Sequence, residues 1–81
     1  MSPDLLRRIG AALYGEHWPS ELARDLGVPR RTVQRWEAGD APIPLTLRRD
    51  LARLVAMRQD VLGKLYRELE RFPIRLHNRR S

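Results

Sequence analysis

The 81-residue sequence contains no cysteine, which excludes disulfide bonds and leaves no thiolate for metal binding or nucleophilic catalysis. It also lacks any apolar run near the roughly 20 residues that are needed to span a membrane. Its first four residues show neither the basic nor the apolar region of a signal peptide. We therefore expect a cytoplasmic protein of one small domain with no membrane partner.

The patterns that mark catalytic and cofactor sites are also missing. The sequence shows no nucleophile–histidine–acid arrangement, no glycine-rich phosphate loop and no paired carboxylates in an apolar setting. His17 and His77 lie sixty residues apart without cysteine partners, which is a poor basis for a metal site. We expect no enzymatic activity, no cofactor, no metal and no small-molecule ligand.

What the sequence has in excess is positive charge. The formal net charge is +6, and 15 of the 16 basic residues are arginines, Lys64 being the exception. Such a charge speeds encounters with polyanions, and arginine suits the planar, bidentate geometry of phosphate and guanine. Composition alone is compatible both with nucleic-acid binding and with a merely basic surface, so the spacing of the apolar residues must decide.

The apolar spacing is helical, and no stretch alternates as a β-strand would, which predicts an all-α fold. Helices are expected over residues 3–14, 18–27 and 29–38. Ser2 and Pro3 are typical of a helix start, and Pro19 and Pro29 suit the first positions of the next two helices. The second predicted helix ends at Gly27, and Gly15 and Gly39 directly follow the other two. In the first helix Leu5, Leu6, Ile9, Ala12 and Leu13 share one face. In the second, Leu22, Ala23 and Leu26 form the inner face.

The third predicted helix divides into two faces. Val33 and Trp36 lie on one side, and four polar residues occupy the opposite arc within about 140°. These four are Arg30, Arg31, Gln34 and Arg35. The division predicts a helix anchored on one face and free to bind a partner with the other, although the arginines could also be a solvated surface.

A loop with two prolines, residues 40–44, precedes a long helical pattern from Leu45 to Arg71. Arg58 interrupts the apolar series. The pattern fits either one helix or two helices broken near residues 59–60. Pro73 ends it, and we divide the chain into residues 1–58, a helical extension over 59–72 and a basic tail over 73–81.

Residues 22–28 and 31–39 resemble the core of the Cro/C1-type (XRE-like) helix-turn-helix family. Ala23 is the small residue where the two helices cross, Gly27 forms the turn, and Trp36-Glu37-Ala38-Gly39 matches the Trp-Glu-x-Gly that ends the recognition helix in this family. The resemblance implies a lambda-repressor-like DNA-binding domain of four to five helices. It covers about residues 5–54.

By this resemblance Arg30, Arg31, Gln34 and Arg35 contact bases. Two positions depart from the family pattern: Pro19 and Pro29 replace residues, often Gln and Ser, that donate hydrogen bonds. Contacts to the DNA backbone are expected from Trp18, Ser20, Thr32, Arg48 and Arg49. For Trp18 a core position is the alternative, and for Arg48 and Arg49 a solvated surface is.

The long helix carries more apolar residues than a four-helix body of this size can cover. The surplus is Val61, Leu62, Leu65, Tyr66, Leu69 and Phe72. We expect these residues to pair with a second copy, the alternative being that this segment folds back on its own chain.

Together these features predict a homodimeric, sequence-specific binder of double-stranded DNA that regulates transcription, most simply as a repressor at a palindromic operator. The alternative is an interaction adaptor or antitoxin whose helix-turn-helix docks a protein. RNA binding is less consistent with a chain that lacks a β-platform of stacking aromatics.

Overall fold

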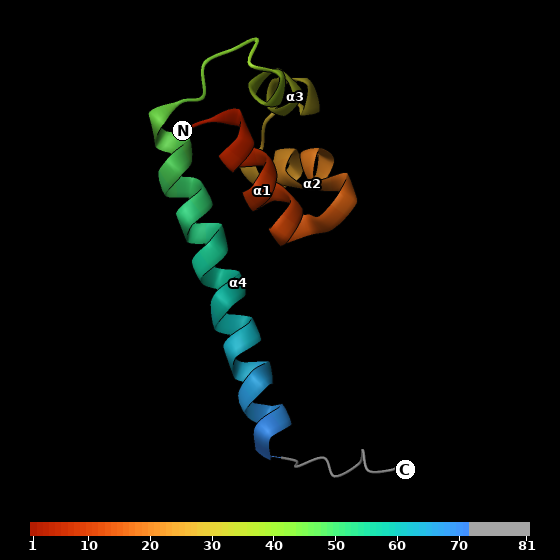
Figure 1. Ribbon diagram of the computed structural model, residues 1–81, viewed down its shortest axis with the longest axis vertical. Coiled ribbons are helices and arrows are strands. Elements are labelled where there is room, and N and C mark those ends of the chain that lie inside the picture. The colour runs from red at the N-terminus through yellow and green to blue at the C-terminus, as the bar shows by residue number, and fades with distance from the viewer. Residues whose placement is uncertain (72–81) are drawn as a thin grey trace.

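The computed structural model describes residues 1–71 and is all-helical over that range (Figure 1), which confirms the predicted all-α class. Its elements are α1 (Pro3–Tyr14), a 3-10 turn η1 (Gly15–His17), α2 (Trp18–Leu26), α3 (Arg30–Ala38) and α4 (Leu45–Arg71). Phe72 and the basic tail, residues 73–81, lie outside the described residues, so the expectations for them stand as made.

The helix ends follow the local signals in the sequence. The Ser2 side chain accepts a hydrogen bond from the backbone N–H of Leu5 at 3.1 Å and so caps α1. Gly27 and Gly39 end α2 and α3 with left-handed backbones, at φ 74° and 79°. Two boundaries were wrong by one residue. The α2 helix ends at Leu26, before Gly27, and Pro29 precedes α3 in an extended conformation, with ψ 146°, so that α3 begins at Arg30.

The core lies among α1, α2, α3 and the first turns of α4. Its buried members are Leu6, Trp18, Leu22, Ala23, Val33, Trp36, Leu47 and Leu51. In α1 the prediction of one inner face was only partly right, because Leu5 is 37% exposed and Ala12 is also exposed. Their side of α1 borders α4 instead of the core.

The long C-terminal pattern forms one helix, α4, with no break at residues 59–60. It extends well beyond the other helices (Figure 1) and gives the molecule principal dimensions of 53 × 23 × 20 Å. The alternative in which this segment folds back on its own chain is therefore wrong. We call residues 59–71, the projecting half of α4, the arm.

Arg58, which interrupts the apolar series of α4, joins α4 to the end of α1. Its guanidinium donates a hydrogen bond to the carbonyl oxygen of Leu13 and lies 5.8 Å from the centre of the Tyr14 ring. A cation at a helix C-terminus offsets the partial negative charge of the free carbonyls. Arg58 therefore marks the place where α4 leaves the body.

Candidate nucleic-acid interface

A short turn at residues 27–29 connects α2 to α3 and fixes how the two helices pack. The backbone N–H of Val28 donates to the carbonyl oxygen of Ala23 at 3.0 Å, and that of Gly27 donates to Arg24 at 3.2 Å. Ala23 is only 3% exposed, and its small side chain lets the helices approach closely. The predicted turn at Gly27 is confirmed by its left-handed backbone, and Ala23 is buried as a residue at a helix crossing should be.

The inner face of α3 is anchored in the core. Val33 is fully buried and Trp36 is 7% exposed, as the division of the helix into two faces predicted. At its C-terminal end, the Arg7 guanidinium of α1 donates a hydrogen bond to the carbonyl oxygen of Glu37 at 3.2 Å. These contacts hold α3 in one orientation, so its outer face is presented to solvent by a rigid support.

The outer face of α3 brings together the four residues predicted to contact bases, Arg30, Arg31, Gln34 and Arg35. All four are exposed, and we call them the α3 basic face. Within residues 1–71 none of its three arginines forms an ion pair, whereas Arg7, Arg8, Arg24 and Arg53 each pair with a carboxylate on their own helix. The α3 basic face is thus an uncompensated cluster of positive charge.

The residues predicted to contact the DNA backbone fall into different environments. Ser20 and Thr32 are half-buried, near the starts of α2 and α3. Arg48 and Arg49 are exposed in α4, with Arg48 lining a groove beside α1. Trp18 belongs to the core at 7% exposure, which favours the core alternative.

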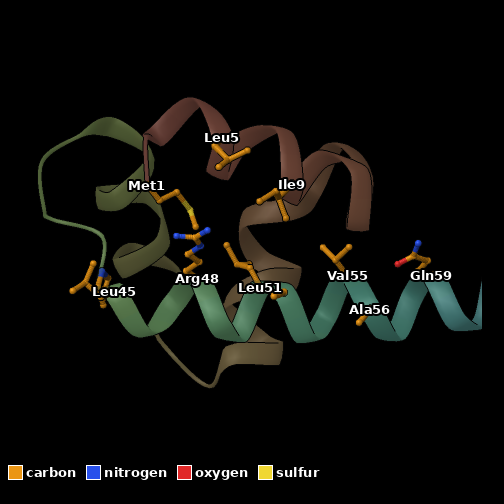
Figure 2. Close-up of a pocket in the computed structure, with 11 residues that line it drawn as sticks. Met1, Leu5, Ile9, Leu45, Arg48, Leu51, Val55, Ala56 and Gln59 are labelled. Carbon is orange, nitrogen blue, oxygen red and sulfur yellow. The ribbon is translucent and has the colours of Figure 1, made fainter.

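A groove between α1 and α4 is the main feature that sequence reasoning missed. Figure 2 shows Leu5 and Ile9 on α1 above Leu51 and Val55 on α4. The groove is mostly apolar and encloses about 690 Å³. In the sequence, the only sign of this groove is that Leu5, Ile9 and Ala12 lie on one side of α1. The sequence does not show that this side faces α4.

The predicted dimer surface, as far as residue 71, is exposed to solvent on the arm. The side chains of Val61, Leu62, Leu65, Tyr66 and Leu69 are between 51% and 67% exposed. They continue, beyond Arg58, the face of α4 that is buried in the body. An exposed apolar stripe is the kind of surface that often marks an interaction site.

Within residues 1–71 no helix is both long and apolar enough to cross a membrane, and no cluster of His, Asp or Glu has a metal-binding arrangement. Comparisons with protein-family models, curated proteins and solved structures gave no match.

Proposed function

We propose that this protein is a sequence-specific DNA-binding regulator of transcription, with α2 and α3 as the helix-turn-helix and α3 as the recognition helix. The observation that carries the proposal is the α3 basic face, whose three arginines stand on a helix anchored by Val33 and Trp36 and form no ion pair with any described residue. The resemblance of residues 22–28 and 31–39 to the Cro/C1-type family also makes α3 the recognition helix. We propose a lambda-repressor-like arrangement of the helices on the same basis. Repression by occupying a promoter is the simplest action for a chain of this size.

The residues of the α3 basic face match the chemistry of base edges. Arginine pairs bidentately with guanine O6 and N7, and glutamine with adenine N6 and N7, each pair giving about 1–3 kcal/mol of discrimination. We therefore expect guanines opposite Arg31 and Arg35 and propose Arg30 and Gln34 as further readers. Ser20, Thr32 and Arg49 are proposed to contact phosphates, which position the protein without reading sequence.

The start of α3 offers a second means of holding phosphate. No side chain caps this helix, because Pro29 stands at the capping position. Free amides at a helix N-terminus, together with the helix dipole, favour an anion. We propose that the amides of Arg30 and Arg31 face a DNA phosphate in the complex, which compensates for the hydrogen-bond donor lost with proline at position 29.

A single α3 of nine residues spans only a few base pairs, so we propose that the protein binds a palindromic operator as a homodimer. The arm supplies the dimer surface.

Replacing Leu65 with Asp places a charge on the stripe without touching the core, since Leu65 is 51% exposed. The Leu65→Asp variant should be monomeric in sedimentation and bind operator DNA much more weakly. Lys64→Gln, with the same change in net charge, is the control and should behave as the wild type.

The exposed stripe of the arm also supports a second candidate, an adaptor or antitoxin that uses its helices to dock a protein. Fluorescence anisotropy with a randomised duplex separates the two. The regulator binds duplex DNA at low salt, with affinity that falls steeply as salt rises. No binding at low salt by the full-length protein would overturn the regulator and favour the adaptor.

A further inference from the structure

Two apolar surfaces are uncovered in the part of the chain that the structure describes, the groove between α1 and α4 and the stripe on the arm. We propose that the groove of each copy receives the arm of a second copy, so that two α4 helices run antiparallel. This inference rests on the dimer of the proposed function and specifies its geometry. One partner, a second copy of this chain, then covers both surfaces.

The two surfaces are joined by a continuous row of residues on α4. The row is spaced alternately by three and four positions, and we call it the seam. It consists of Leu45, Arg48, Ala52, Val55, Gln59, Leu62, Tyr66 and Leu69. The first five line the groove, and a second hollow, beside Ile9 and Ala12 of α1, continues it along Val55, Gln59, Leu62 and Tyr66. A repeat averaging 3.5 residues is the pattern by which two helices pair along their length.

Side-chain size along the seam favours antiparallel pairing. The one alanine of the seam, Ala52, lies in its N-terminal half, whereas its C-terminal half contains the bulky residues Leu62, Tyr66 and Leu69. When the helices run antiparallel about the level of residue 57, Leu62 of one copy lies opposite Ala52 of the other. A parallel pair would place Leu62 against Leu62 and leave the groove of each copy empty.

The position of α1 supports the same orientation. Leu5 and Ile9 line the side of the groove opposite α4 (Figure 2). In an antiparallel pair, the equivalent flanking positions of the two helices lie on the same side of the seam. The second copy's Leu65, which flanks its seam, therefore lies against this part of α1. The arm of one copy is then packed between α1 and α4 of the other. Two-fold symmetry repeats this contact, so that both grooves and both arms of the dimer are covered.

Arg48, which lines the groove, also has a partner in this arrangement. Arg48 lies opposite the second copy's Tyr66, whose ring face attracts a guanidinium. Twelve residues separate Leu45 from the proposed axis, so the two α4 N-termini would lie about 36 Å apart along the paired helices.

Disulfide trapping tests the orientation, because the natural chain has no cysteine. Ala52→Cys and Leu62→Cys change exposed positions, and the two full-length variants carry tags of different size. They are mixed, equilibrated and mildly oxidised. We expect the Ala52→Cys/Leu62→Cys heterodimer as the main product, with loss of both monomer bands. Lys64→Cys, on the other side of α4, is the control and should cross-link with neither.

A predominant Leu62→Cys homodimer would show parallel helices and overturn the proposal, as would the absence of any cross-link. DNA binding by the reduced variants is measured in parallel and reports on the proposed function separately. A homodimeric cross-link in a protein that still binds duplex DNA would reject this geometry while leaving the regulator standing.

Discussion

The backbone of Gly10 in α1 lies directly against the indole ring of Trp18 in α2. A Cβ atom at position 10 would stand 2.2 Å from Trp18 Cε3, closer than any real contact. Because Trp18 is buried in the core, the ring has little room to move away. The absence of a side chain at Gly10 therefore sets how closely α1 and α2 approach.

We expect Gly10→Ala to destabilise the fold by about 1–3 kcal/mol through overpacking, even though alanine is the better helix former. Urea unfolding measures the free energy of unfolding. Gly63→Ala is the matched control, since its nearest neighbour is the flexible Arg67 guanidinium at 3.6 Å. That variant should gain about 0.5–1 kcal/mol. An increase in stability for Gly10→Ala would contradict the tight contact.

The link between Arg58 and the end of α1 gives a second prediction. Arg58→Met keeps the aliphatic length but removes the hydrogen bond to the Leu13 carbonyl oxygen. We expect a loss of about 1–2 kcal/mol in unfolding free energy. Arg53→Met, which removes only an exposed ion pair with Asp50, should cost less than about 0.5 kcal/mol. Equal effects from the two variants would show that Arg58 has no special role.

Tyr14 predicts a change of stability at high pH. Its hydroxyl donates a hydrogen bond to Asp25 at 2.6 Å. Burial, together with this hydrogen bond and the charge of Asp25, raises the pKa of Tyr14 from 10.0 to about 12, although Arg58 acts in the opposite direction. The folded state thus holds its proton more tightly than the unfolded state does. The stabilisation is complete below pH 10 and is lost as the pH rises toward 12.

Two measurements check this. In a Tyr66→Phe background, the absorbance of ionised tyrosine reports Tyr14 alone, and its midpoint should lie well above 10. The melting temperature should fall between pH 10 and pH 12 more in the wild type than in Tyr14→Phe. Identical falls in the two proteins would remove Tyr14 as the cause.

The proposed phosphate contact of Arg49 differs from a base contact in its signature. Arg49→Ala should weaken binding about equally for all duplexes and reduce the slope of log K against log salt concentration by about 1. Arg53→Ala, an exposed arginine paired with Asp50, is the control and should leave the slope unchanged. A sequence-dependent loss for Arg49→Ala would mean that it reads bases instead.

Local signals in the sequence were enough for most of the fold. Ser2, Gly27 and Gly39 set helix ends through caps and left-handed turns, which depend on neighbouring residues only. Pro29 was misplaced by one residue because its fixed φ suits both the capping position and the first helical position. The two faces of α3 also follow from sequence spacing alone.

What depends on distant contacts was not predictable. The helical wheel of α1 grouped Leu5 with Leu6, but only the placement of α4 shows that Leu5 borders a groove while Leu6 is fully buried. Arg58 looked like an interruption of an apolar stripe because its partners, Leu13 and Tyr14, lie more than forty positions earlier.

The most direct test of the central claim is selection of bound sequences from a random duplex pool. We predict that the wild-type protein enriches a palindrome with guanines in each half, and that Arg31→Ala and Arg35→Ala each lose the preference at one position while staying folded. Arg24→Ala, an exposed arginine of α2 paired with Glu21, is the control and should select the same palindrome. If the wild type enriches no particular sequence, or if both variants keep the guanine preference, the claim that α3 recognises the bases is contradicted.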